Sequence, residues 1–130
     1  MKRAKALDHV VLVVNDVETT MAWYQRHLGL EGVRIDEWRN KSAPFPSLRI
    51  TDDTIIDLIP GHDGHRGHID HLCFVVSAPD LAAMRADPEL TVIEEGKRFG
   101  AQGVADSIYV TDPDGLTVEF RSYESSAGSP

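Results

Sequence analysis

The sequence predicts an α+β domain built from two tandem β-α-β-β-β modules, whose mixed sheets form a cup. An internal repeat is the first reason: with an offset of 62 residues, residues 8–14 (DHVVLVV) align with residues 70–76 (DHLCFVV), and four of the seven positions are identical. The same offset aligns residues 54–58 (TIIDL) with residues 116–120 (LTVEF), so a carboxylate falls on a carboxylate. The order of strand and helix signals also repeats. We therefore expect two copies of one module within a single domain of 130 residues.

The first module, about residues 7–60, opens with a strand and a helix. Residues 7–14 are mostly apolar and many are β-branched, which is typical of a buried strand. Apolar residues then recur at helical spacing over residues 17–28, and Gly29 stands where a helix commonly ends in the left-handed conformation. These signals predict the β-α start of the module.

Three strands complete the first module. Residues 33–38 are predicted as its second strand, and a loop follows over residues 40–46. Residues 48–51 and 55–59 flank Asp52-Asp53, which is a hairpin signal. The module is therefore expected to end in a hairpin.

A linker rich in Gly and His, residues 61–67, precedes the second module at residues 68–123. The first strand of this module is predicted over residues 68–76. A short helix follows at residues 81–85, because Pro88 cannot sit in a helix interior.

The second module then repeats the remaining strands of the first. Residues 90–94 are predicted as a strand and residues 96–103 as a glycine-containing loop. Residues 107–111 and 116–122 are expected to pair as a hairpin, in register with the hairpin of the first module. Small polar residues at 124–130 predict a frayed tail.

Composition and charge narrow the classes of function. The net charge of −8 argues against binding to nucleic acid, which relies on Lys and Arg at the phosphates, and it gives no reason to expect a membrane partner. One cysteine excludes an intramolecular disulfide, so a cytoplasmic location is expected. The longest apolar stretch is too short to span a bilayer.

Strand alternation predicts a metal centre in the cup. Because side chains alternate between the two faces of a strand, His9 and His71 occupy equivalent faces, as do Asp57 and Glu119. If these faces turn inward, two imidazoles and one or two carboxylates meet among apolar side chains, where an unpaired carboxylate is costly. A divalent ion resolves that conflict, and two histidines with one carboxylate suit iron, manganese, zinc or nickel. The alternative for each residue alone is a hydrogen-bonded histidine or a solvated acid on an edge strand.

The chain resembles the vicinal oxygen chelate superfamily, which includes the glyoxalase, bleomycin-resistance, fosfomycin-resistance and extradiol dioxygenase proteins. It is most similar to the small, single-domain type that contains a glyoxalase domain. The resemblance extends over residues 7–123 and is carried by Leu7-Asp8-His9-Val10, Trp23-Tyr24, Leu28-Gly29-Leu30, Asp70-His71, residues 100–109 and residues 112–119.

This resemblance implies one divalent metal per site, with His9, His71 and Glu119 as ligands. Members with glyoxalase I activity have a glutamate as fourth ligand at the position of Asp57, and an aspartate is one methylene shorter. Asp57 is therefore a fourth ligand, a residue that supports the ligands, or a bystander. The resemblance also implies a homodimer in which modules from two chains complete each cupped sheet.

Several further residues are candidates for a substrate pocket. Arg49, Tyr109 and Arg121 face the cup if the strand registers hold, and they would suit an anionic or oxygen-rich substrate; salt bridging is the alternative. Arg98, next to Lys97, lies where relatives place a loop that contacts substrate.

The histidines of the linker region and the cysteine are harder to interpret. His62, His65, His68 and His71 recur every three residues, but three of them lie in a glycine-rich segment where such spacing has little meaning. We expect solvated loop histidines there, with His68 as the candidate for the pocket edge. Cys73 falls on the ligand-bearing face and is expected to be a buried structural residue rather than a ligand.

Two classes of function follow from these features. The first is a metal-dependent enzyme that binds a small substrate through vicinal oxygens, with glyoxalase-like lyase or isomerase chemistry favoured and with Glu119 and Asp57 as its catalytic carboxylates. Extradiol-type oxygenation and fosfomycin-type addition are the enzymatic alternatives. The second class is a binding protein of the bleomycin-resistance kind, which holds a drug without a metal; the His9, His71 and Glu119 set counts against it.

Overall fold

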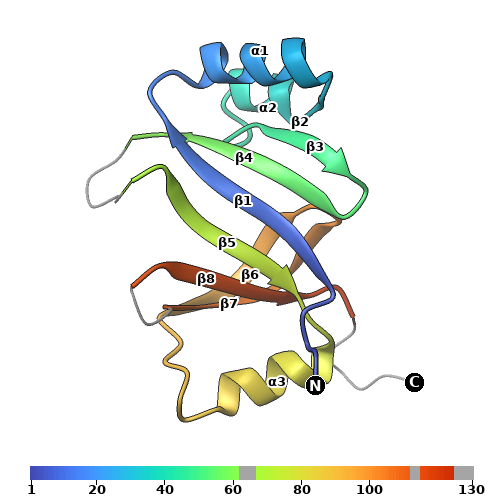
Figure 1. The fold of residues 1–130 in the computed structure, drawn as a ribbon, viewed down its shortest axis with the longest axis vertical. Helices are drawn as coiled ribbons and strands as arrows, with labels where there is room; N and C mark the ends of the chain where they lie inside the picture. Colours follow the sequence, from blue (N-terminus) through green and yellow to red (C-terminus); the bar gives the residue numbers. More distant parts are fainter. Residues whose placement is uncertain (62–66, 112–114, 125–130) are drawn as a thin grey trace.

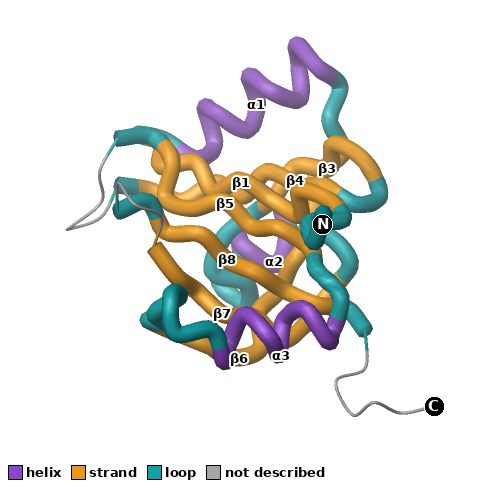
Figure 2. The backbone as a smooth tube through the Cα atoms, turned by 60° about the horizontal axis from the view of Figure 1, so that its bottom comes forward, coloured by secondary structure: helices purple, strands orange, loops and turns teal. Residues whose placement is uncertain are grey.

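The computed structural model describes residues 1–61, 67–111 and 115–124. Its elements are eight strands and three helices: β1 (Ala6–Val14), α1 (Val17–Leu28), β2 (Glu31–Val33), α2 (Ile35–Arg39), β3 (Ser47–Thr51), β4 (Thr54–Pro60), β5 (Ile69–Val75), α3 (Ala78–Ala86), β6 (Glu94–Gly100), β7 (Gly103–Thr111) and β8 (Thr117–Ser122). The strands form one mixed sheet in the order β2-β3-β4-β1-β5-β8-β7-β6. Figure 2 shows this sheet curving from β3 and β4 round to β6 and β7.

The sheet repeats its pairing pattern in the two halves, which confirms the predicted duplication. In each half the first strand pairs in parallel with the last one, β1 with β4 and β5 with β8. The two halves join through the antiparallel pair β1 and β5. This pairing lies within one chain. The homodimer with modules paired between chains stays a prediction.

Each half has its own apolar core on the outer face of the sheet. In the first half, Met21 of α1 packs against Leu48 and Leu58 of the strands. In the second half, Leu81 and Met84 of α3 form a core with strand residues, and α1 and α3 lie at opposite ends of the sheet (Figure 1). With both helices outside, the concave face is left for polar residues.

The start of each helix has a clear local cause. Asp16 caps α1 by accepting a hydrogen bond from the Thr19 N–H at 2.9 Å, and Gly29 ends it with φ 67°. Ser77 caps α3, which extends beyond the predicted residues 81–85 on both sides.

The predicted strand over residues 33–38 is wrong, because most of it is helix α2. The chain leaves β2 at Arg34, whose φ of 59° is left-handed and incompatible with a continuing strand. The Arg34 carbonyl then accepts the first helical hydrogen bond, from the Trp38 N–H at 2.9 Å.

The predictions for residues 90–94 and 96–103 are also wrong. A strand, β6, covers most of the predicted loop and pairs with β7 from Glu94 to Gly100, so β7 begins at Gly103 instead of residue 107. The backbone hydrogen bonds between β6 and β7 outweigh the local preference of the glycines in this segment for turns.

Three sequence-based expectations fall wholly or mainly outside the described residues. They concern His62 and His65, the connection between the two strands of the predicted hairpin of residues 107–111 and 116–122, and the predicted tail over residues 124–130. Among the residues that are described, no helix is both long and apolar enough to cross a membrane.

Candidate metal centre

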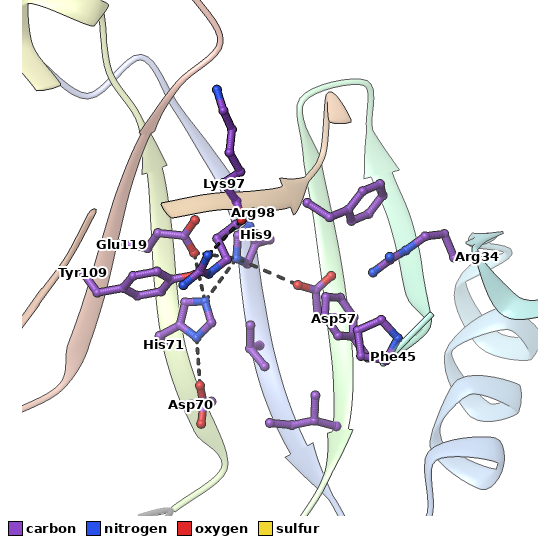
Figure 3. A pocket seen from close by; sticks show the side chains of 14 residues that line it. His9, Arg34, Phe45, Asp57, Asp70, His71, Lys97, Arg98, Tyr109 and Glu119 are labelled. Carbon is purple, nitrogen blue, oxygen red and sulfur yellow. Dashed lines mark hydrogen bonds and ion pairs between the residues drawn. The ribbon is translucent and has the colours of Figure 1, made fainter. Parts of the chain in front are cut away.

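Four neighbouring strands bring the predicted ligand residues together on the concave face. His9 lies on β1, His71 on β5 and Glu119 on β8, and Asp57 lies on β4 at the other side of β1 (Figure 3). The strand register places Val11 opposite both Asp57 and His71. The side-chain parity read from the sequence therefore holds for all four residues.

The ligand atoms of His9, His71 and Glu119 form a compact triangle. The Nε2 atoms of the two histidines are 3.2 Å apart, and Oε1 of Glu119 lies 3.2 Å from the Nε2 of His9 and 3.1 Å from that of His71. Neighbouring ligands of an ion with bonds of about 2.1 Å lie roughly 3.0–3.4 Å apart. Two imidazoles and one carboxylate at this spacing fit a divalent transition metal.

Both histidines are oriented by the aspartate that precedes them in the sequence. Nδ1 of His9 lies 2.7 Å from Oδ1 of Asp8, and Nδ1 of His71 lies 2.8 Å from Oδ2 of Asp70. A hydrogen on Nδ1 leaves the lone pair on Nε2, which is the atom that faces the triangle. The repeated Asp-His pair thus presents both ligand nitrogens to one point.

The charges around the histidines favour their protonated forms when no metal is bound. Burial alone lowers the pKa of His9, but its contacts with Asp8 and Glu119 raise it to about 9. The pKa of His71 is also raised, since its contacts with Glu119 and Asp70 outweigh the effect of burial. A metal must displace these protons, so binding is expected to weaken as the pH falls.

Asp8 is the centre of a buried network behind His9. Its Oδ1 accepts the Ala101 N–H at 2.9 Å, and its Oδ2 accepts a short hydrogen bond from the Tyr123 hydroxyl. Gly100 makes room for this network, because a Cβ there would lie 2.6 Å from Asp8 Oδ1 and from Arg121 Cζ. These contacts fix Asp8, and through it the ring of His9.

Glu119 is held in its ionised form. Although burial alone raises its pKa, hydrogen bonds to His71 and His9 bring the pKa well below its ordinary value. Arg121, which is fully buried, donates from Nη1 to Oε2 of Glu119 at 3.0 Å. The oxygen that faces the histidines is Oε1, so Oε2 is used for support.

Asp57 lies close to this triangle in a different environment. Its Oδ2 is 3.9 Å from Nε2 of His9, and its Oδ1 accepts the Ser47 hydroxyl at 2.5 Å. Burial raises the pKa of Asp57, and the nearby charge of His9 only partly opposes this. The side chain is therefore the more easily protonated of the two carboxylates.

A cavity of about 350 Å³ opens over the triangle. All four polar residues line it, and Tyr109, Lys97 and Arg98 close one side. Such a volume suits a small organic ligand. The arrangement combines a floor of three candidate metal ligands with a protonatable carboxylate in the wall.

The sequence profile of the glyoxalase/bleomycin resistance protein/dioxygenase superfamily matches residues 6–120. The chain belongs to this superfamily. It is 31% identical over 121 residues to a virulence protein of Salmonella typhimurium, with 90% of this chain and 83% of that protein covered. It is 33% identical over 129 residues to a glyoxalase domain-containing protein of Mycosarcoma maydis, with 92% and 69% covered.

Two solved structures share this fold. Methylmalonyl-CoA epimerase from Mycobacterium tuberculosis has a TM-score of 0.67 at 21% identity, over 100% of this chain and 95% of that chain. The Mn(II)-bound glyoxalase from Novosphingobium aromaticivorans also has a TM-score of 0.67, at 23% identity, over 94% of this chain and 40% of that chain. At these identities the likeness shows the fold alone.

In this glyoxalase-superfamily chain, the five candidate pocket residues separate into two groups. Arg98 and Tyr109 line the cavity. Within the described part of the chain, the other three are not among its lining residues. Arg49 donates to the Ala101 carbonyl at 2.9 Å, Arg121 lies behind Glu119, and His68 lines a separate groove beside Asp16.

Cys73 is fully buried next to the site. Burial raises the pKa of its thiol far above the usual range, so the thiol stays protonated. This agrees with the structural role expected from the sequence.

Two groups of residues at the candidate site were not predicted from the sequence. Asp8 and Asp70 were visible in the repeat, and their position before each histidine could have identified them. Arg34, Phe45 and Phe99 also line the cavity, but they come from segments with no motif.

Proposed function

We propose that this protein is a divalent-metal-dependent enzyme with glyoxalase-like lyase or isomerase chemistry, acting on a small substrate that binds through two vicinal oxygens. The observation that carries the proposal is the His9, His71 and Glu119 triangle at the floor of a cavity, with Asp57 in its wall. The superfamily includes metal-bound glyoxalases, which supports the assignment.

His9, His71 and Glu119 would hold the ion, and zinc, nickel, manganese and iron all suit this donor set. When bound, the ion supplies Lewis-acid chemistry that favours negative charge on a substrate oxygen. Asp8 and Asp70 keep the imidazoles in the ligating tautomer, and Arg121 keeps Glu119 in place.

Asp57 is the candidate for proton transfer. A general base works best when its pKa lies near the working pH, and burial moves the pKa of Asp57 upward. Ser47 fixes one carboxylate oxygen, so the other remains near His9 on the cavity side. In this role Asp57 takes a proton from the carbon beside the substrate carbonyl and returns it elsewhere.

The enzymatic alternatives differ in the metal and in the reagent. Two histidines and one carboxylate are the ligands of many iron oxygenases, so extradiol-type dioxygenation is the runner-up. A fosfomycin-type transferase or hydrolase would use the same ligands. A drug-binding protein without metal would have no use for the triangle.

Elemental analysis of protein purified without chelator tests the metal centre. About one divalent transition metal per chain is expected, and His71→Ala should lose it while the circular dichroism spectrum stays unchanged. A protein that holds no metal and regains none on titration contradicts the enzyme proposal. Unchanged metal content in His71→Ala would exclude His71 as a ligand.

Deuterium exchange tests the reaction type. In D2O the metal-loaded protein should exchange protons beside the carbonyl in members of a panel of small 2-oxo and 2-hydroxy carbonyl compounds, followed by NMR. Absence of exchange across the panel, together with metal-dependent oxygen consumption, would favour the dioxygenase.

We also propose a cytoplasmic homodimer with two equivalent sites, as the family resemblance implies. Sedimentation velocity should give a dimer at micromolar concentration. A monomer would contradict this part of the proposal and leave the metal centre unaffected, because one chain already supplies all three ligands.

A further inference from the structure

We infer that the substrate carries a carboxylate remote from its metal-binding end, and that Arg34 binds this carboxylate. The inference rests on the proposed function in one respect only: that the cavity over the triangle is the substrate site. Arg34 lines that cavity, on the far side of Asp57 from the histidines in the view of Figure 3.

Arg34 has a free pair of donors on one edge of its guanidinium group. Both Nε and Nη2 are buried, and neither has a hydrogen-bond partner among the described residues. The N–H groups of these two nitrogens point in parallel and can donate one hydrogen bond to each oxygen of a carboxylate. Buried donors are normally paired, so two unpaired donors on one edge of a guanidinium group indicate a missing acceptor.

Two aromatic rings hold the guanidinium in place. Its Cζ lies 3.8 Å from the ring centroid of Phe99 and 4.7 Å from that of Phe45. Rings against the guanidinium plane leave only its edges for hydrogen bonds. The group is therefore preorganised for a planar, two-oxygen acceptor.

The backbone at Arg34 gives independent support. Its φ of 59° is left-handed, a conformation that favours Gly or Asn and is uncommon for other side chains. This φ turns the chain from β2 into α2, and it also holds two unpaired buried donors at the cavity; residues that combine an uncommon backbone conformation with unpaired donors cluster at functional sites.

The charges of the cavity agree with an anionic ligand. Its described lining contains three cationic side chains, Arg34, Lys97 and Arg98, and three carboxylates, Asp57, Asp70 and Glu119. A divalent ion would leave an excess of positive charge there, although the whole chain carries −8. The other two cations are already paired: Arg98 donates from Nη2 to Glu94 at 2.7 Å, and Lys97 Nζ lies 3.1 Å from an oxygen of Asp106. Arg34 is thus the cation best placed to be neutralised by substrate.

Matched pairs of 2-oxo acids test the inference. 2-Oxoglutarate and 2-oxoadipate carry a distal carboxylate, whereas 2-oxopentanoate and 2-oxohexanoate end in a methyl group. Calorimetric titration of the zinc-loaded wild type should show roughly 10- to 100-fold tighter binding of a dicarboxylate than of its methyl counterpart. Arg34→Gln should abolish this preference without changing zinc affinity, and Arg34→Lys should keep part of it.

Two further variants locate the effect. Arg98→Gln should reduce the preference less than Arg34→Gln, and Arg39→Gln, on the exposed α2 surface, should not change it. Equal binding of both acids by the wild type, or a loss in Arg98→Gln as large as in Arg34→Gln, would overturn the inference.

A measurement on metal-free protein separates this inference from the proposed function. Adipate should shift the Nε–H resonance of Arg34 in an NMR titration even when no zinc is present. Zinc binding without any response of Arg34 to adipate or to the 2-oxo dicarboxylates would overturn the Arg34 assignment alone. A response of Arg34 in a protein that takes up no zinc would overturn the metal centre alone.

Discussion

Glu119 in the second module and Asp57 in the first occupy equivalent positions, 62 residues apart, but their surroundings differ. Arg121 supports Glu119 at 3.0 Å, whereas the same offset places Ile59 beside Asp57. The pKa of Glu119 is lowered by its histidine contacts, and the pKa of Asp57 is raised by burial. The duplication has thus kept two carboxylates in place with opposite pKa shifts, which agrees with our proposal that Glu119 binds the metal and Asp57 transfers the proton.

The largest expected effect is on metal binding by the second module. Glu119→Gln should reduce metal uptake to a level that elemental analysis and calorimetric titration no longer detect, because the carboxylate supplies the only anionic ligand of the triangle. Asp57→Asn is the matched change in the first module and should keep metal affinity within a few-fold. Loss of metal in both variants would show that Asp57 is a fourth ligand.

The next largest effect is on the rate of proton transfer, which should depend on Asp57. Asp57→Asn should slow the deuterium exchange by roughly 10²- to 10⁴-fold, the usual contribution of a general base. The NMR exchange rate at saturating metal measures this. An unchanged rate would remove Asp57 from proton transfer and leave it as a bystander.

A smaller effect compares the two aspartates that orient the histidines. Changing such a partner of a metal ligand usually lowers metal affinity 10- to 100-fold. Asp8→Asn should lie near the upper end of this range and Asp70→Asn near the lower end, since Asp8 is fully buried and Asp70 is partly exposed. Competition with a chromogenic chelator gives both affinities, and the reverse order would contradict the network built around Asp8.

The last comparison concerns the stability of the metal-free protein, where the two carboxylates should differ in sign. A lowered pKa means that ionised Glu119 stabilises the fold above its ordinary pKa of about 4.3, and that this contribution is lost as the pH falls. A raised pKa means that ionisation of Asp57 costs stability as the pH rises. At neutral pH, Glu119→Gln should therefore be destabilised, by about 3–5 kcal/mol for a broken buried pair, while Asp57→Asn is as stable as wild type or more stable.

Urea denaturation in the presence of chelator at neutral pH and near pH 4.5 checks these signs. The advantage of Asp57→Asn over wild type should shrink toward the lower pH. An advantage that grows as the pH falls would show that Asp57 is stabilised in its ionised form.

The sequence allowed the duplicated fold and the clustering of the three candidate ligands to be predicted for a shared reason. Two-residue alternation and one repeat offset can both be read from the sequence without knowledge of tertiary contacts, and they were enough to place His9, His71 and Glu119 on one face. The errors came where a distant contact or an uncommon backbone conformation decided the outcome. Arg34 turns the chain into α2 with a positive φ that a non-glycine residue does not signal, and β7 converts an apparent glycine loop into β6.

The candidate pocket shows the same limit. Arg49 and Arg121 have the residue type expected at an anionic substrate site, but carbonyl groups and Glu119 take up their donors. Arg34 was not predicted, because its cavity position depends on contacts with Phe45 on the loop before β3 and Phe99 on β6, which no local pattern at residue 34 indicates. Whether an arginine has a structural role or is free to bind a ligand depends on its partners in the folded chain, which a local sequence pattern does not show.

Anomalous diffraction from crystals of the zinc- or manganese-loaded protein tests the central claim most directly. We expect one strong anomalous peak per chain, about 2.0–2.2 Å from Nε2 of His9, Nε2 of His71 and an oxygen of Glu119. A peak at another place, or none at these three residues in a fully loaded protein, would contradict the account.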